Sequence, residues 1–267
     1  MCQQKEPHFF SQDRVTIDPD LIVKSEAAYL RLFEPAENSR MTGEASPSYL
    51  WHPEVPTRIK NKSPNAKVIA ILRDPIGRAY SQYLMDIADG LEAISFYDAI
   101  LRDQKNMTKV YGTGQLYIEL GFYAEQIRRY LDVFGPEQVL VVSFDTFSAC
   151  TRQVVRQVIS FLGLDPSHVD KIDTATVYNR GRVPRNALVQ QLARLRILRR
   201  LYRSTVPVPL RVRIRDRLIV ARPKRAIDPR AVDVLQTIYT PQLESLDREC
   251  GITMPELKKA WREMQGG

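Results

Sequence analysis

Two short runs of apolar, mostly β-branched residues stand out along the chain. The first is KVIAIL at residues 67–72 and the second is QVLVVSF at residues 138–144. Strands of a parallel sheet are covered on both faces, so they show continuous apolar runs instead of alternating apolar and polar residues. The two runs therefore predict parallel strands that are buried on both faces.

Segments with apolar residues at helical spacing flank these runs. After the first run, Asp74 is a candidate N-cap and Pro75 a candidate first helical residue, which predicts a helix that continues over residues 76–86. Two more helices are predicted at residues 123–134 and 151–162, each followed by a glycine. Helices that alternate with buried strands indicate parallel crossovers and a layered α/β fold.

The pattern changes after Asn179. Residues 187–202 place leucines on one stripe with arginines around it, and residues 206–220 form a basic connector interrupted by prolines. We expect residues 186–226 to form a basic helical segment or lid, inserted in a single domain that spans residues 1–267.

The last part of the chain, from Asp228 to Trp261, has the periodicity of a long helix. Its apolar residues recur at helical spacing: Val232, Leu235, Ile238, Tyr239, Leu243 and Leu246. We expect this face of the helix to pack against the core.

Composition favours a folded domain over disorder, because the 267 residues are 44% hydrophobic and 26% charged. The net charge of +8 is uneven, since residues 194–225 contain eleven Arg and one Lys against the single acid Asp216. This segment leaves open the interpretation that the chain binds polyanions or a membrane surface. In the main interpretation we expect no nucleic-acid partner, and membrane contact stays open.

The sequence shows no sign of membrane insertion, secretion or metal binding. It has no apolar run of about eighteen residues and no signal peptide at its start. Its three cysteines, Cys2, Cys150 and Cys250, and its three histidines are scattered without the spacing of metal ligands. We therefore expect a metal-free protein of a reducing compartment, the cytoplasm.

Two polar residues stand where the first predicted strand passes into its helix. Arg73 ends the strand, and Ser81 lies eight positions further along. Ligands of open α/β sheets bind at the carboxyl ends of strands, and a guanidinium can grip a phosphate with two hydrogen bonds. The pair is a candidate phosphate clamp. The alternative is that Arg73 pairs with a carboxylate and Ser81 only packs the helix.

The segment ILRDPIGRAYSQY at residues 71–83 closely resembles the 3′-phosphate-binding motif of sulfotransferases, in the branch that includes the heparan sulfate enzymes and bacterial relatives. Further segments resemble that family in the same order: KEPHFF at 5–10, GEASPSYL at 43–50, residues 121–147 and FLGLDP at 161–166. The resemblance implies a P-loop-like parallel sheet flanked by helices. It also implies that 3′-phosphoadenosine 5′-phosphosulfate is the co-substrate, with Arg73 and Ser81 on its 3′-phosphate.

The same resemblance implies an activity and its catalytic residues. The sulfuryl group would pass to a hydroxyl or amine of a carbohydrate or lipid-like acceptor. The carboxylate in motifs like KEPHFF is the proposed general base of the heparan-type enzymes, and its match here is Glu6. His8, two residues on, would support it. The alternative is an exposed glutamate beside a structural histidine.

A basic loop of the related enzymes closes over the phosphates of the nucleotide. Its place here is held by RPKRAIDP at residues 222–229, so Lys224 and Arg225 are further candidates for nucleotide binding. A solvated basic loop is the alternative. Ala45 stands where heparan-type members often have lysine, so a heparan-like acceptor does not follow from the resemblance.

In the family, a first strand and a glycine-rich loop with a lysine precede the KEPHFF-like motif and bind the 5′-phosphosulfate. The sequence shows no such loop before Lys5. We therefore expect an α/β fold that lacks its first strand, with exposed sheet edges and doubtful activity. Two further interpretations stay open, a non-catalytic nucleotide-binding relative and a truncated inactive fragment.

Overall fold

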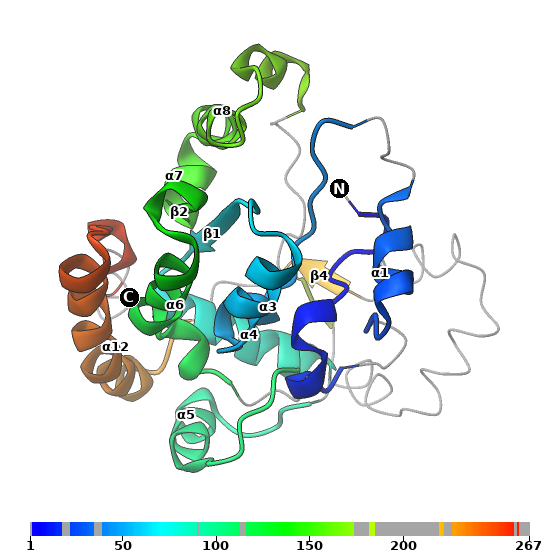
Figure 1. Cartoon of the computed structure of the whole chain (residues 1–267). Helices are drawn as coiled ribbons and strands as arrows, with labels where there is room; N and C mark the ends of the chain where they lie inside the picture. The colour runs from blue at the N-terminus through cyan, green and yellow to red at the C-terminus, as the bar shows by residue number, and fades with distance from the viewer. Residues whose placement is uncertain are drawn as a thin grey trace.

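A parallel pair of strands with helices on either side organises the computed structural model (Figure 1). The structure describes residues 2–17, 22–34, 39–89, 91–112, 116–173, 182–184, 219–221, 226–258 and 261. Its elements in chain order are η1 (Phe9–Arg14), α1 (Glu26–Arg31), α2 (Ser48–Trp51), α3 (Val55–Lys62), β1 (Val68–Leu72), α4 (Pro75–Asp89), α5 (Phe96–Lys105), η4 (Glu119–Gly121), α6 (Tyr123–Phe134), η5 (Pro136–Gln138), β2 (Val139–Ser143), α7 (Phe144–Ala149), α8 (Thr151–Phe161), η6 (Pro166–Lys171), β3 (Arg182–Pro184), β4 (Ile219–Ala221), α12 (Pro229–Cys250) and η7 (Pro255–Lys258).

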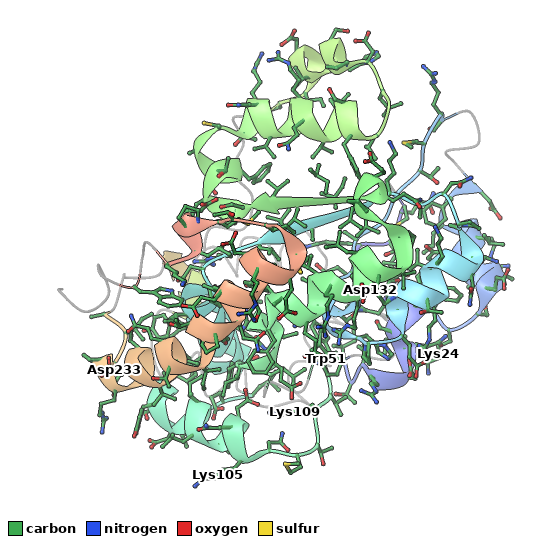
Figure 2. The ribbon with its side chains drawn as sticks, turned by 60° about the vertical axis from the view of Figure 1, so that its left-hand side comes forward. Lys24, Trp51, Lys105, Lys109, Asp132 and Asp233 are labelled. Carbon is green, nitrogen blue, oxygen red and sulfur yellow. The ribbon has the colours of Figure 1, made fainter. Side chains whose placement is uncertain are left out.

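The predicted α/β arrangement is confirmed. Strands β1 and β2 are parallel, in a register that runs from Val68 opposite Val139 to Leu72 opposite Ser143. Figure 2 shows the two strands edge on, with α8 on one side and α6 and α12 on the other. The core between the sheet and the layer of α6 and α12 contains fully buried side chains, those of Leu72, Ile76, Ile127, Leu235 and Tyr239.

The expectation that β1 is buried on both faces is wrong. Ala70 and Leu72 are buried against the α6 and α12 layer, but Ile69 is 36% exposed and Ile71 is 50% exposed on the opposite face. Residues paired in register share a face, and there the partner of Ile71, Val142, is buried. The α8 layer therefore covers β2 on this face and leaves β1 open to solvent.

Helix α4 begins as the sequence predicts. The two carboxylate oxygens of Asp74 accept hydrogen bonds from the backbone N–H groups of Ile76, at 3.2 Å, and Gly77, at 2.7 Å. The indole of Trp261 also donates to Asp74. Burial raises the pKa of Asp74, while these hydrogen bonds act in the opposite direction. The cap thus fixes the turn that carries Arg73 and joins it to the C-terminal part of the chain.

The predicted helix from Asp228 to Trp261 is too long. Helix α12 ends at Cys250, because Gly251 adopts a left-handed conformation with φ of 66° and its N–H bonds to the carbonyl of Asp247. Its predicted apolar face is confirmed, since five of the six residues are buried and Ile238 packs against them.

Part of the predicted architecture lies outside the described residues. Strands β3 and β4 pair antiparallel through Arg182 opposite Ala221, and most of the segment 186–226 falls between them in the undescribed part of the chain. The arginine-rich part of the alternative polyanion or membrane binder falls there too. Among the described helices, none combines the length and the apolar character needed to cross a membrane.

Candidate active site

The turn at Glu6 and His8 is held in an unusual backbone conformation. Both residues have positive φ, 58° and 51°, which is rare for side chains other than glycine. Such conformations cost about 1–3 kcal/mol each and persist only where the surroundings impose them. Here the N–H of Val23 donates to the carbonyl of Pro7, and the N–H of His8 donates to the hydroxyl of Ser46. The turn is therefore fixed by residues of two other segments.

The imidazole of His8 is buried and held by hydroxyl groups. His8 is only 2% exposed, and its Nδ1 lies 2.6 Å from Ser48 Oγ. Ser48, at the start of α2, lies 2.7 Å from Ser11 Oγ of η1. Burial lowers the pKa of His8, against the opposing effect of the Glu6 carboxylate. The imidazole is therefore held in its neutral form at neutral pH.

A partly buried carboxylate, that of Glu44, supports this arrangement. Glu44 accepts hydrogen bonds from Tyr49 at 2.7 Å, Tyr29 at 3.1 Å and Ser46 at 3.2 Å. Burial raises the pKa of Glu44, and the three hydroxyl donors act against that rise. Because Ser46 also binds the backbone of His8, the segments KEPHFF and GEASPSYL form one hydrogen-bonded unit.

Tyr111 lies against His8, and no local pattern in the sequence marks it. The two rings have their centres 5.7 Å apart. The backbone of Tyr111 bonds to that of Arg14 at 3.0 Å and that of Thr16 at 2.8 Å, which fixes its position beside the turn. Burial raises the pKa of Tyr111 to about 12, with a further contribution from the Glu6 carboxylate. The phenol is therefore protonated at neutral pH and can donate a hydrogen bond.

Arg73 lies at the carboxyl end of β1, where the sequence placed it. Its side chain is exposed, and its guanidinium lies 5.5 Å from the ring centre of Phe144, the first residue of α7. In the described part of the chain Arg73 forms no salt bridge, whereas the alternative interpretation required a carboxylate partner. A guanidinium in this state is suited to bind an anion.

Ser81 lies in α4 and is half-buried. Among the described residues, no direct contact joins Ser81 to Arg73. Arg78, three positions before Ser81, donates to the side chain of Gln82, at 2.9 Å, and to the carbonyl of Tyr117. A shared phosphate contact of Arg73 and Ser81 therefore stays a prediction.

The other predicted site residues do not enter this geometry. Lys224 and Arg225 lie outside the described residues, so their role stays a prediction. Within the ranges that the structure describes, no cluster of three or more His, Cys, Asp or Glu side chains is arranged to hold a metal ion.

Sequence reasoning missed the residues that hold the turn. Ser46 and Ser48 belong to GEASPSYL, a segment that resembles the family, but nothing in the sequence pointed to a role for its serines. The spacing of two serines around a proline was the only local signal, and it does not say which side chain the hydroxyls meet.

Comparison with known proteins finds similar chains over most of this one. Residues 1–168 match the model of the sulfotransferase family. Over 166 residues the chain is 30% identical to heparan sulfate glucosamine 3-O-sulfotransferase 3B1 of Mus musculus, a match that covers 62% of this chain and 40% of that protein. It is 31% identical over 128 residues to bifunctional heparan sulfate N-deacetylase/N-sulfotransferase 3 of Homo sapiens, covering 47% of this chain and 15% of that protein.

A solved structure is similar over almost the whole chain. The crystal structure of a sulfotransferase from Alicyclobacillus acidocaldarius superposes with a TM-score of 0.69 and 27% identity, and the match covers 98% of this chain and 87% of that one. The chain spans less than half the length of the curated relatives that it matches. Since the family model covers well over half of the chain, the chain belongs to the sulfotransferase family.

Proposed function

We propose that this chain transfers the sulfuryl group of 3′-phosphoadenosine 5′-phosphosulfate to a hydroxyl or amine of a carbohydrate acceptor. The observation that carries the proposal is the strained turn of Glu6 and His8, which lies inside the segment that matches the sulfotransferase family. Strained backbone of this kind clusters at active sites, because the rest of the fold must hold it in place. The names of the curated relatives support a carbohydrate as acceptor.

The residues at the end of β1 suit the nucleotide. The guanidinium of Arg73 is exposed and without a salt-bridge partner in the described part, at the sheet edge where α/β folds bind ligands. We propose that it binds the 3′-phosphate with two hydrogen bonds and that the Ser81 hydroxyl adds a third. When bound, the nucleotide supplies the activated sulfuryl group. Lys224 and Arg225 are further candidates for contacts with its phosphates.

The turn suits proton removal from the acceptor. The Glu6 side chain is 36% exposed, and its carboxylate lies 3.3 Å from the ammonium group of Lys5, which is 78% exposed. An accessible carboxylate can take the proton of an acceptor hydroxyl that lies within hydrogen-bond reach. The neutral imidazole of His8 and the phenol of Tyr111 lie beside it and can orient the acceptor.

A hollow lined by residues that follow the turn in the sequence suits a sugar. It has a volume of about 550 Å³ and is lined by Phe9, Phe10, Gln12, Asp13 and Arg58. Aromatic faces pack against the C–H groups of a sugar ring, and the polar side chains can bind its hydroxyls.

The three free cysteines, Cys2, Cys150 and Cys250, agree with work in a reducing compartment such as the cytoplasm, which we propose as the location.

Titration with two nucleotides tests the clamp. The probes are 3′-phosphoadenosine 5′-phosphate and adenosine 5′-phosphate, which differ only in the 3′-phosphate, with affinity measured by isothermal titration calorimetry. We expect Arg73→Ala to weaken the first nucleotide about 10- to 100-fold, because charge-assisted hydrogen bonds contribute about 1.5–3 kcal/mol. Ser81→Ala should weaken it about 3- to 10-fold. Neither variant should change the affinity for adenosine 5′-phosphate.

Arg152→Ala is the matched control, because Arg152 is an exposed arginine of α8 that pairs with Asp170 at the surface. Its affinity for both nucleotides should equal that of the wild type. Equal losses for the two nucleotides in Arg73→Ala would show that the arginine does not read the 3′-phosphate. A transfer assay with the sulfate donor and carbohydrate acceptors then tests the activity, and loss of turnover in Glu6→Gln without loss of nucleotide binding is the expected result.

A further inference from the structure

The hydroxyl groups of Ser11 and Ser48 form a buried chain that ends on His8. Both serines are fully buried, with 0% exposure. Ser48 Oγ lies between the imidazole Nδ1, at 2.6 Å, and Ser11 Oγ, at 2.7 Å. Because these hydroxyls are buried, they must form hydrogen bonds with other protein groups, and each hydroxyl proton has few possible acceptors.

The distances favour one direction for these protons. Ser11 Oγ has two possible acceptors, Ser48 Oγ at 2.7 Å and the carbonyl of His8 at 3.4 Å, and the shorter contact is the better hydrogen bond. Ser11 therefore donates to Ser48. A hydroxyl has one proton, and that of Ser48 is then left for Nδ1, at 2.6 Å. The alternative direction would leave Ser11 only the carbonyl of His8, at 3.4 Å, as its acceptor.

This direction decides which nitrogen of His8 carries its proton. A neutral imidazole has one N–H, and a filled Nδ1 acceptor places it on Nε2. Among the described residues Nε2 has no hydrogen-bond partner, so its proton is free to meet a reacting group.

We propose that Ser48, supported by Ser11, is a positioning residue that fixes the proton of His8 on Nε2 and makes this ring a hydrogen-bond donor in the active site. The inference rests on the proposed function for its role in turnover, but its structural claim does not. The Nε2–H group would orient the Glu6 carboxylate or an oxygen of the acceptor during sulfuryl transfer. Neither serine touches the substrates in this arrangement.

Nitrogen NMR of histidine tests the claim directly. Two-bond ¹H–¹⁵N spectra of the ¹⁵N-histidine-labelled full chain report which ring nitrogen is protonated. The resonances of His8 are assigned by their loss in His8→Gln. We expect the wild type to show the proton on Nε2, and Ser48→Ala to show a mixture of both forms or the proton on Nδ1. His52 and His168 should keep their wild-type resonances.

Two variants keep the test decisive. Ser48→Thr retains the hydroxyl and should restore the Nε2 form. Ser11→Ala removes only the hydroxyl that donates to Ser48, so it tests the same hydrogen bonds if Ser48→Ala fails to fold. Ser160→Ala, an exposed serine of α8, is the control and should change nothing. A wild-type proton on Nδ1, or an unchanged tautomer in both Ser48→Ala and Ser11→Ala, would overturn the proposal.

Kinetics distinguish this positioning role from the function itself. We expect Ser48→Ala to lower kcat about 10- to 100-fold, a part of what a positioned proton donor contributes, with the KM for the sulfate donor unchanged. Ser48→Thr should recover most of kcat. If no carbohydrate is sulfated by the wild type, the proposed function fails while the NMR result still decides the position of the proton.

Discussion

Gly121 lies against the buried ring of Tyr239 without room for a side chain. A Cβ built on Gly121 would lie 2.6 Å from Cε1 and 2.9 Å from the hydroxyl oxygen of that ring. Tyr239 is fully buried, and its hydroxyl donates to the carbonyls of Tyr117, at 3.1 Å, and Ile118, at 2.9 Å. The ring is therefore held from two sides and cannot move away.

We expect Gly121→Ala to lower the free energy of unfolding by about 1–3 kcal/mol, because overpacking forces the ring or the backbone to shift. Urea denaturation measures the change. Gly163→Asn is a suitable control, since Gly163 has a φ of 75° that Asn tolerates and no atom within 4 Å of its Cβ position. Similar losses in the two variants would contradict the steric explanation.

At the scale of single residues, the sequence predicts which side chains have functional chemistry better than it predicts which of them lie in contact. Glu6, His8, Arg73 and Ser81 were named because their side chains have functional chemistry and lie in family-like segments. Tyr111 could not be named, because its place beside His8 depends on a backbone pairing between residues that are distant in the sequence. Long-range pairing leaves no mark in a local pattern.

A cluster of charges joins η1 to α3. Arg58 of α3 donates to both carboxylate oxygens of Asp13, at 2.5 and 3.1 Å, and also to the carbonyl of Phe10, at 2.8 Å. His52 lies 3.2 Å from the same carboxylate. The hydrogen bonds from Arg58 hold the pKa of Asp13 well below its usual range. The cluster thus fixes the element that carries Ser11.

The sign of this shift predicts how stability depends on pH. A carboxyl with a depressed pKa stabilises the fold above its unfolded pKa, about 3.9, and the contribution is lost as pH falls toward the folded pKa. We expect Asp13→Asn to lower the free energy of unfolding at pH 7 by about 0.5–1 kcal/mol, a small value because Asp13 is 46% exposed. The difference from wild type should shrink steadily below about pH 4.

Urea denaturation at a series of pH values from 7 to 2 measures that difference. Asp170→Asn, which breaks the exposed pair with Arg152, should have almost no effect at any of them. A gap between Asp13→Asn and wild type that stays constant with pH would show that lost packing, and not the charge, is responsible.

Elements were predicted well where the apolar periodicity is strong and their ends are marked. Helix α6 has its predicted bounds, and β1 and β2 lie within their predicted runs. The predicted end of α12 was wrong, although Gly251 and Pro255 were visible as stop signals in the sequence. The prediction that β1 is buried on both faces was wrong because an apolar run does not reveal how many neighbouring elements cover a strand.

The whole molecule has an uneven sheet, with one face of β1 exposed. Leu72 is fully buried against α6 and α12, whereas its neighbour Ile71 is 50% exposed. We expect Leu72→Ala to lower the free energy of unfolding by about 2–5 kcal/mol, since it leaves a cavity in the core. Ile71→Ala should lower it by less than about 1 kcal/mol.

Chemical denaturation of the two variants checks this comparison. Losses of similar size would mean that Ile71 is covered in solution, in contrast to its exposure in this structure. The comparison also separates a loss of core packing from a loss of strand propensity, because both substitutions fall in the same strand.

At the scale of the molecule, the sequence predicted the α/β class because strands and helices alternate along the chain, and family-like segments follow in order. The role of residues 186–226 stays a prediction, as does the absence of a first strand. Amphipathic helices and basic connectors leave their position relative to the sheet open, because many placements bury the same leucines.

The backbone at Glu6 and His8 would be more comfortable with glycine, which adopts positive φ without penalty. Selection for stability alone would therefore favour glycine at both positions, so the carboxylate and the imidazole are kept at a cost in stability because the chemistry needs them. Related chains that have lost the activity should accumulate glycine at these two positions, which would distinguish them from active relatives.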